Sequence, residues 1–177
     1  MSAFKFYSIV RLEATTDLSK FKCSDEDLND FLWNEAKDYQ AEMLAVTYLL
    51  IDPDTEDIAA YFSLLTDQIR FTPDENSIRN RINRKIPHSK QRHHYPAIKI
   101  GRLAVSAAYE HQGVGRYAIR FIRQTIKECF PIGCRFLTVD AYANATGFYE
   151  SCGFHFFTLK DEGEATRLMY CDVKTYI

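Results

Sequence analysis

The fold is decided by the stretch AIKIGRLAVSAAYEHQGVGR, which spans residues 97–116. Its first half is rich in Ile, Leu and Val and predicts a β-strand over residues 97–105. Its second half carries Gly113 and Gly115 where a helix is expected to begin. Glycine lets the backbone approach a ligand, and the N–H groups of a first helical turn attract anions. The stretch therefore predicts an anion site, although Gly-x-Gly alone also fits a tight helix entry without a ligand.

Strands and helices alternate on both sides of this stretch. After it, the apolar spacing predicts a helix to about residue 129, a strand over 135–140, a short helix over 144–151, and a strand pair near 154–159 and 166–173. Before it, the pattern predicts a strand over 6–12, a helix from the acidic cap at 24–27 to about 40, a hairpin of strands 44–51 and 58–65, and a long connection over 72–96 with a short helix around 76–84. The fold class is α/β, or α+β with a mixed sheet.

Composition indicates an ordinary soluble globular protein. The 177 residues are 46% hydrophobic and 26% charged, with no repeat and no linker, so we expect a single domain over 1–177. The sequence shows neither a membrane-spanning run nor a signal peptide, and a cytoplasmic location follows. Five cysteines are an odd number without zinc-knuckle spacing, which favours small buried thiols, with Cys152 as the one alternative nucleophile.

Charge is distributed unevenly along the chain. Eight of the 22 Lys and Arg residues fall between Asn76 and Glu110, and none of the 24 Asp and Glu residues does. The remaining chain therefore carries an excess of ten negative charges, although the net charge is only −2. A basic segment on an acidic body suits an anionic partner. The eight residues are Arg79, Arg81, Arg84, Lys85, Lys90, Arg92, Lys99 and Arg102.

Two motifs resemble those of the GNAT superfamily of N-acetyltransferases. Arg102-Leu103-Ala104-Val105 followed by Gly113-Val114-Gly115 is similar to the acetyl-CoA motif. The segment from Phe148-Tyr149 to Gly153-Phe154, about 35 residues later, is similar to the motif that closes the cofactor groove. The resemblance implies a single GNAT-like domain whose mixed sheet is splayed between its fourth and fifth strands, with helices on both faces.

The same resemblance implies where acetyl-CoA binds. Its pantetheine would pair with the backbone of Leu103, Ala104 and Val105, and its pyrophosphate would rest on the loop that follows. Glu110 departs from the family pattern, which commonly has Gln or Arg there, so Gln112 is the alternative for that role. The remaining expected cofactor contacts are His111, Gln112, Gly113, Val114, Gly115, Arg116, Asn144 and Phe148.

Transfer of an acetyl group to an amine requires a proton for the departing thiolate. The resemblance places Tyr149 in that role, and a free phenol, with a pKa near 10, is protonated at neutral pH. The alternative is a core tyrosine that only lines the groove. The strand residues Lys99 to Arg102 contain no carboxylate, so no general base is identified, and the amine is expected to arrive neutral or to lose its proton through water.

A second resemblance concerns the acceptor. Phe21-Lys22-Cys23-Ser24, Leu28-Asn29-Asp30-Phe31-Leu32, the strand end at Asp52 and the Arg102 motif are similar to the GNAT-type toxins of bacterial toxin–antitoxin modules. These toxins acetylate the α-amine of aminoacyl-tRNA, and the resemblance implies a homodimer and a DNA-binding antitoxin partner. No membrane partner is expected, because no apolar run is long enough to span a bilayer. The basic segment would then grip tRNA phosphates through Arg79, Arg81, Arg84, Lys85 and Arg92.

Two other functions remain open at the level of sequence. One is an acetyltransferase for a small amine or a protein N-terminus, with the basic segment only a solvated loop. The other is an acyl-CoA-binding module that has lost its chemistry, against which Tyr149 and the glycine turn both argue. His88, His93 and His94 lack a nearby Cys, Asp or Glu, so no metal site is expected.

Overall fold

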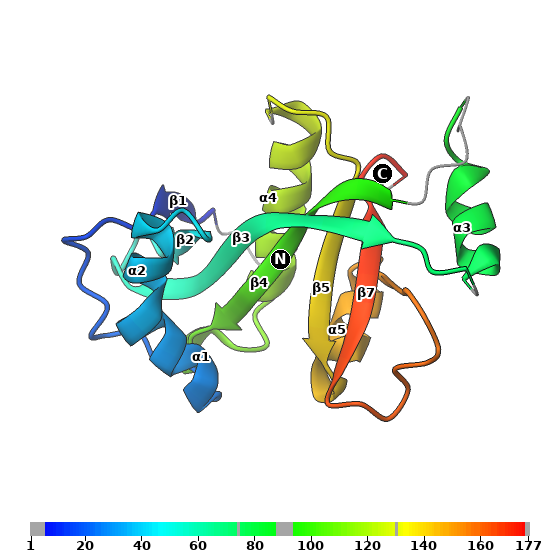
Figure 1. Cartoon of the computed structure of the whole chain (residues 1–177). Helices are drawn as coiled ribbons and strands as arrows, with labels where there is room; N and C mark the ends of the chain where they lie inside the picture. Colours follow the sequence, from blue (N-terminus) through cyan, green and yellow to red (C-terminus); the bar gives the residue numbers. More distant parts are fainter. Residues whose placement is uncertain (1–5, 74, 88–93, 130, 176–177) are drawn as a thin grey trace, which may run out of the picture. The chain divides into compact units, whose positions relative to one another are not determined.

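The computed structural model describes residues 6–73, 75–87, 94–129 and 131–175. The chain divides into two compact units, one made of Met1–Leu65 with Ile100–Ile122 and the other of Thr66–Lys99 with Arg123–Ile177. Within the described residues, seven strands form a sheet in the order β1-β2-β3-β4-β5-β7-β6 (Figure 1). This mixed sheet with helices confirms the predicted fold class.

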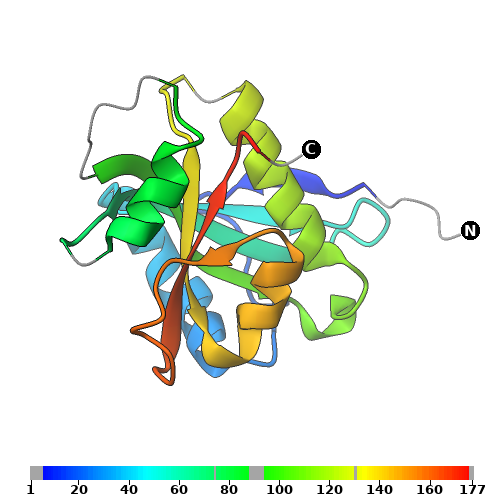
Figure 2. The ribbon, with the colours of Figure 1, turned by 90° about the vertical axis from the view of Figure 1, so that its right-hand side faces the viewer.

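The first unit is built on four neighbouring strands. They are β1 (Ser8–Arg11), β2 (Val46–Ile51), the first part of β3 (Ile58–Arg70) and the last part of β4 (His94–Val105). The β2–β3 hairpin is confirmed, and its pairing runs from Val46 opposite Leu64 to Ile51 opposite Ile58. One face carries α1 (Glu26–Asp30), η1 (Phe31–Glu35) and α2 (Ala36–Ala41), and the other carries the start of α4 (Val114–Glu128) (Figure 2).

Aromatic packing holds the first group of helices on its sheet. Tyr61 of β3 is fully buried, stacks on Phe31 and meets Phe21 edge to face. Its hydroxyl donates to the carbonyl of Leu28 at 2.7 Å, which fixes α1 to the strand. The expected single helix contains a π-helical turn at η1, where the N–H of Ala36 reaches the carbonyl of Phe31. Such turns are rare in helices and are frequent at functional sites.

The second unit contains the remaining strands and two short helices. It takes in the end of β3, the start of β4, β5 (Phe136–Tyr142), β6 (His155–Phe156) and β7 (Thr166–Asp172). The helix α3 (Asn76–Asn83) lies on one face of these strands, and α5 (Thr146–Ser151), preceded by the short turn η3 (Ala143–Ala145), lies on the other (Figure 2). Its core is aromatic and is formed by Ile69, Phe71, Ile82, Tyr95, Ala97, Phe136, Phe157 and Tyr170.

Two boundaries differ from those expected. The connection between β3 and β4 is shorter than residues 72–96, because β4 begins at His94 and contains Pro96. The strand expected over 154–159 is only two residues long. It ends early because the carboxylate of Asp161 accepts the N–H of Leu168 at 2.8 Å and binds Arg167 at 2.7 Å. That carboxylate takes the place of a strand partner.

Two further expectations concern the burial of the cysteines and the presence of a membrane-spanning helix. Cys23, Cys152 and Cys171 are buried free thiols, but Cys129 is exposed and Cys134 is half-buried, so the prediction that all five are buried is wrong. In the described part of the chain, no helix combines the length and apolar character needed to cross a bilayer.

The acidic cap of α1 gives a stability prediction. Asp25 accepts hydrogen bonds from the N–H groups of Asp27 at 2.9 Å and Leu28 at 3.2 Å. We expect Asp25→Ala to lower the free energy of unfolding by about 1 kcal/mol in urea denaturation, because two N–H groups lose their acceptor. Ser24→Ala is the matched control and should stay within about 0.5 kcal/mol of the parent. An equal loss in both variants would show that Asp25 is not the cap.

Candidate active site

The loop between β4 and α4 is held by backbone hydrogen bonds at its start. The N–H of Ser106 donates to the carbonyl of Ala59, and the N–H of Ala107 donates to the carbonyl of Lys22, both at 2.9 Å. A 3-10 turn, η2 (Ala107–Tyr109), follows at once. The loop therefore leaves the end of β4 along a fixed path.

The turn into α4 depends on left-handed backbone conformations. His111 has φ 59° and Gly113 has φ 83°, a region that glycine enters without cost. A Cβ added to Gly113 would meet nothing within 4 Å, so the space before the turn is open. The first hydrogen bond of α4 joins the N–H of Tyr117 to the carbonyl of Gly113 at 3.0 Å. Helix geometry leaves the earlier N–H groups, including those of Val114 and Gly115, without an acceptor inside the helix.

These features fit a pyrophosphate. The first-turn N–H groups and the positive end of the helix dipole stabilise an anion, and glycine lets the anion come close. Val114 is only 2% exposed and anchors the turn to the core, whereas Arg116 is exposed. The predicted contacts His111 to Arg116 thus lie in one continuous turn. Gln112 is exposed, and its side-chain amide donates to the carbonyl of Ala108 at 2.9 Å. Glu110 is half-buried.

A buried carboxylate supports this loop, a role that was not predicted from the sequence. Asp52 is 1% exposed and accepts a hydrogen bond from the Tyr109 hydroxyl at 2.8 Å. Thr55 also meets that hydroxyl, at 3.0 Å. Burial, together with the bond to Asp52, raises the pKa of Tyr109, so the phenol stays a donor. In the sequence, Asp52 marked a strand end that is similar in the GNAT-type toxins, but nothing linked it to a tyrosine 57 positions away.

The end of β4 contributes backbone and one arginine. Ala104 is buried, and its neighbours Leu103 and Val105 are half-buried. The Arg102 guanidinium lies over the Phe31 ring at 5.0 Å and donates to the carbonyl of Gly101 at 3.0 Å. The described strand offers no carboxylate between Lys99 and Val105. The side chains here are therefore suited to binding and not to removing a proton.

Tyr149 lies in the second unit, on α5. It is 7% exposed, and its ring meets Phe148 at 5.1 Å and Phe154 at 5.3 Å, both edge to face. Burial, reinforced by the neighbouring Cys152, raises the pKa of Tyr149 far above that of a free phenol. Among the described residues, none hydrogen-bonds to its hydroxyl. Tyr149 is thus a rigidly held phenol that keeps its proton at neutral pH.

The other expected site residues of the second unit are divided between two elements. Asn144 is exposed on η3, two residues before α5 begins, and Phe148 is half-buried on α5 beside Tyr149. Cys152 is 2% exposed, which leaves its thiol poorly placed to act as a nucleophile. Arg79 and Arg81 lie on α3, and Arg84 and Lys85 lie in the turn that ends it. Arg92 lies outside the described residues.

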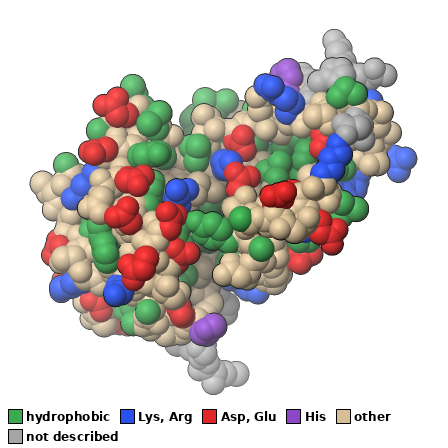
Figure 3. Space-filling model, turned by 60° about the horizontal axis from the view of Figure 1, so that its bottom comes forward, with side chains coloured by type: hydrophobic (Ala, Val, Ile, Leu, Met, Phe, Trp, Pro, Cys, Tyr) green, Lys and Arg blue, Asp and Glu red, His purple; other side chains and the backbone are tan. Residues whose placement is uncertain are grey.

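Acidic residues are concentrated on the first helices of the first unit, and basic residues are concentrated on and after α3 in the second unit. Figure 3 shows acidic side chains gathered over the part of the first unit that carries α1 and α2. Exposed residues there are Glu26, Asp27, Asp30, Asp38 and Glu42. In the second unit, α3 has no acidic residue in its first turn, and it packs its apolar side through Ile82. Among the basic residues of α3 and its final turn, Arg81, Arg84 and Lys85 are exposed and Arg79 is half-buried.

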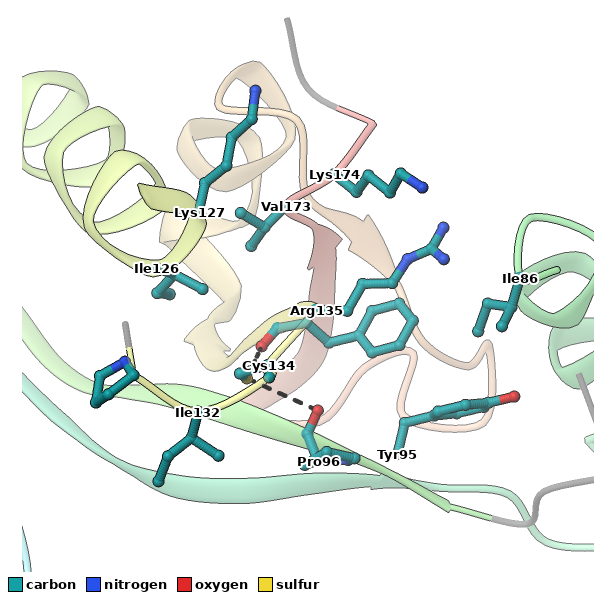
Figure 4. Close-up of a pocket in the computed structure, with 13 residues that line it drawn as sticks. Ile86, Tyr95, Pro96, Ile126, Lys127, Ile132, Cys134, Arg135, Val173 and Lys174 are labelled. Atoms are coloured by element: carbon teal, nitrogen blue, oxygen red, sulfur yellow. Dashed lines mark hydrogen bonds between the residues drawn. The ribbon is translucent and has the colours of Figure 1, made fainter. Parts of the chain in front are cut away.

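A groove of about 560 Å³ lies at the start of β5, the end of that strand opposite to Asn144 (Figure 4). Apolar side chains of Ile126, Ile132 and Val173 line it, and the charged ends of Lys127, Arg135 and Lys174 point away from them (Figure 4). The groove contains none of the residues expected to bind acetyl-CoA, so it is separate from the site that the sequence predicted.

Comparison with protein families gives a match to the model of the acetyltransferase (GNAT) family over residues 13–154. The match includes the glycine turn, the end of β4 and Tyr149.

Solved structures with the same fold include bacterial toxins. A tyrosine-to-phenylalanine mutant of KacT is 24% identical, with a TM-score of 0.71 and 97% of each chain covered. AtaT complexed with acetyl-methionyl-tRNAfMet is 23% identical, with a TM-score of 0.71 and 96% of each chain covered. An AtaT mutant bound to acetyl-CoA and the C-terminus of the antitoxin AtaR is 21% identical, with a TM-score of 0.68, and covers 96% of this chain and 94% of that one. At these identities the likeness establishes the fold.

The glycine turn gives a prediction that separates ligand binding from stability. Gly113→Ala forces a side chain into a left-handed backbone, so the N–H groups of the turn should shift. We expect the Kd for acetyl-CoA, measured by calorimetry, to rise about tenfold, since bonds to a charged phosphate weaken.

Gly163→Ala is the matched control, because Gly163 has φ 91° and an equally open Cβ position in a distant turn of the second unit. It should cost similar stability, about 1 kcal/mol, and leave the Kd unchanged. Equal effects of both variants on the Kd would show that the glycine turn does not hold the cofactor.

Proposed function

The chain belongs to the GNAT family of acetyltransferases, and we propose that it transfers the acetyl group of acetyl-CoA to the α-amine of aminoacyl-tRNA. The enzyme class and the cofactor follow from the family. The acceptor is inferred from the concentration of basic residues on and after α3. The shared fold with AtaT, which has been seen with acetyl-methionyl-tRNAfMet, supports the same acceptor.

The first unit supplies the cofactor contacts in this proposal. When bound, acetyl-CoA supplies the acetyl group as a reactive thioester. The turn from His111 to Arg116 holds the pyrophosphate through backbone N–H groups. The backbone of Leu103, Ala104 and Val105 pairs with the pantetheine arm. Asp52 and Tyr109 keep the turn in place through their 2.8 Å hydrogen bond.

The second unit supplies the acid. The neutral amine would form a bond to the thioester carbon as the carbon–sulfur bond breaks, and Tyr149 would give its proton to the departing sulfur. The proton that the new amide nitrogen loses would return to the phenolate through water, and Asn144 and Phe148 would contact the cofactor. Because burial keeps the phenol protonated, the acid is present in the reactive form at every physiological pH. The chain has no carboxylate on β4 to deprotonate the amine. An α-amine with a pKa near 8 is partly neutral at pH 7.5, whereas a lysine side chain near 10.4 is almost wholly charged.

The partners follow from the same likeness. We infer a homodimer and a DNA-binding antitoxin for this chain, as for the toxins that it resembles. An antitoxin, AtaR, is bound by its C-terminus to AtaT. An acetyltransferase for a small amine or a protein N-terminus is the second candidate, and the absence of a base on β4 favours a weakly basic amine in either case.

Removing the Tyr149 hydroxyl tests the chemistry. We expect Tyr149→Phe to lower kcat by about 10²–10⁴, because general acid catalysis is lost, while the Kd for acetyl-CoA stays unchanged. Tyr48→Phe is the control, since Tyr48 of β2 stacks on Phe62 of β3 and belongs to no proposed site. Unchanged turnover in Tyr149→Phe would remove the acid from the mechanism, and a wild-type chain that binds acetyl-CoA without turnover would be a binding module.

The acceptor is tested with labelled acetyl-CoA and a pool of charged tRNA. We expect label on charged tRNA and none on deacylated tRNA, because only the charged form carries an α-amine. Reversing charge with Arg79→Glu, Arg81→Glu and Arg84→Glu together should abolish the transfer. The matched triple, Lys20→Glu, Lys22→Glu and Arg120→Glu, reverses three exposed charges outside the basic helix and should retain it. Label appearing instead on peptides or small amines would contradict the tRNA acceptor.

A further inference from the structure

A second, smaller pocket lies in the second unit, between the end of α3 and the strands β6 and β7. Its volume is about 150 Å³. Three side chains capable of positive charge line it: Arg81 and Lys85 from the α3 region and His155 from β6. Tyr170 and Asp172 of β7 also line the pocket. Residues that are distant in sequence therefore form one polar pocket.

The cations of the pocket are not neutralised by its acid. Asp172 is engaged by Arg135, which binds its two carboxylate oxygens at 2.9 and 2.8 Å. Arg135 also donates to the carbonyl of Lys85 at 2.9 Å, which fixes the end of the α3 segment. Arg81 lies over the Tyr170 ring at 5.8 Å. The pocket thus carries a net positive charge on a supported framework.

The positive charge of the pocket affects the pKa of His155. Burial and the nearby Arg81 and Lys85 lower the pKa of His155, and Glu150 of α5 opposes them. Its ring lies 6.0 Å from the Tyr170 ring, and Asp172 is the remaining charged group of the pocket. At neutral pH the imidazole is uncharged and can still donate one N–H. An anion in the pocket would offset the repulsion that keeps His155 neutral.

We propose that this pocket binds a phosphate group, held by Arg81, Lys85 and His155 over the Tyr170 ring. Two cationic side chains with a third donor are the groups that bind phosphate oxygens through charge-assisted hydrogen bonds. The phosphate is a backbone phosphate of the acceptor nucleic acid. The assignment of this phosphate to a nucleic acid rests on the proposed function, whereas the binding of a phosphate does not. The same side chains would equally fit the 3′-phosphate of coenzyme A.

Filling the pocket makes binding depend on pH. The bound phosphate raises the pKa of His155, so a proton is taken up on binding. The added affinity is fully present below the pKa of the free protein and is lost as the pH rises through the pKa of the complex. We expect the affinity to be about tenfold higher below the pKa of the free protein than above the pKa of the complex.

The experiment follows the His155 ring by NMR in the full chain, with His155→Gln used to assign its signal among the five histidines. The added probes are inorganic sulfate, deacylated tRNA, coenzyme A and 3′-dephospho-coenzyme A, none of which requires turnover. Sulfate stays a dianion over the whole range and so does not titrate with the histidine. We expect sulfate and tRNA to raise the pKa of His155, and both forms of coenzyme A to leave it unchanged.

Two variants that each remove one positive charge distinguish binding in the pocket from general electrostatic attraction. Lys85→Gln removes an exposed charge of the pocket and should abolish the pKa rise, weaken tRNA binding about tenfold and lower the salt slope by about 1. Arg84→Gln removes one charge from the adjacent position, which does not line the pocket, and should keep the pKa rise. If both variants lose the rise in the pKa of His155, the phosphate pocket is overturned. The rise would then come from the general electrostatic field of the basic residues.

The remaining outcomes separate the proposed phosphate pocket from the proposal that aminoacyl-tRNA is the acceptor. If tRNA is bound and acetylated but the pKa of His155 does not move, the pocket is overturned and the acceptor stands. If sulfate raises the pKa while tRNA is neither bound nor acetylated, the phosphate pocket stands and the acceptor fails. If coenzyme A raises the pKa and its 3′-dephospho form does not, the nucleic-acid source is overturned.

Discussion

The start of α4 imposes the constraint on which the site depends. A helix begins with N–H groups that have no carbonyl one turn earlier, and these groups must meet water or a ligand. Here they follow a turn whose left-handed residues, His111 and Gly113, open the approach to them. Asp52 and Tyr109 support that turn from the β2–β3 hairpin. The fold thus keeps a set of donors fixed and available to a phosphorylated cofactor.

The proposed acid and the backbone donors come from different parts of the chain, and each is prepared differently. The donors are backbone groups whose direction is set by a turn. Tyr149 is a side chain whose proton is retained because its ring is buried between Phe148 and Phe154. Neither arrangement requires a charged residue in the centre of the chemistry. This agrees with a strand, β4, that offers no base near its end.

The sequence predicted those features that depend on interactions between residues close together in the chain. The strand, glycine turn and helix around residue 113 were predicted because they depend on residues close in sequence, and α3 was expected within one residue of its end at Asn83. Long-range contacts were not predictable in this way. The bond from Tyr109 to Asp52 joins residues 57 positions apart, and the short β6 results from Asp161 bonding to Leu168. The π-helical turn at Phe31 likewise forms where helix packing meets Tyr61.

The position of β7 in the sheet has a consequence for synthesis on the ribosome. β7 follows both β5 and β6 in the sequence, yet it lies between these two strands and pairs with both. Until residues 166–172 leave the exit tunnel, the nascent chain therefore exposes one unpaired edge of β5, a segment rich in apolar residues. Unpaired apolar edges are the sites at which incomplete chains aggregate. Completion of this part of the sheet is thus delayed until β7 has been synthesised, and a chaperone that shields strand edges would be most needed before that point.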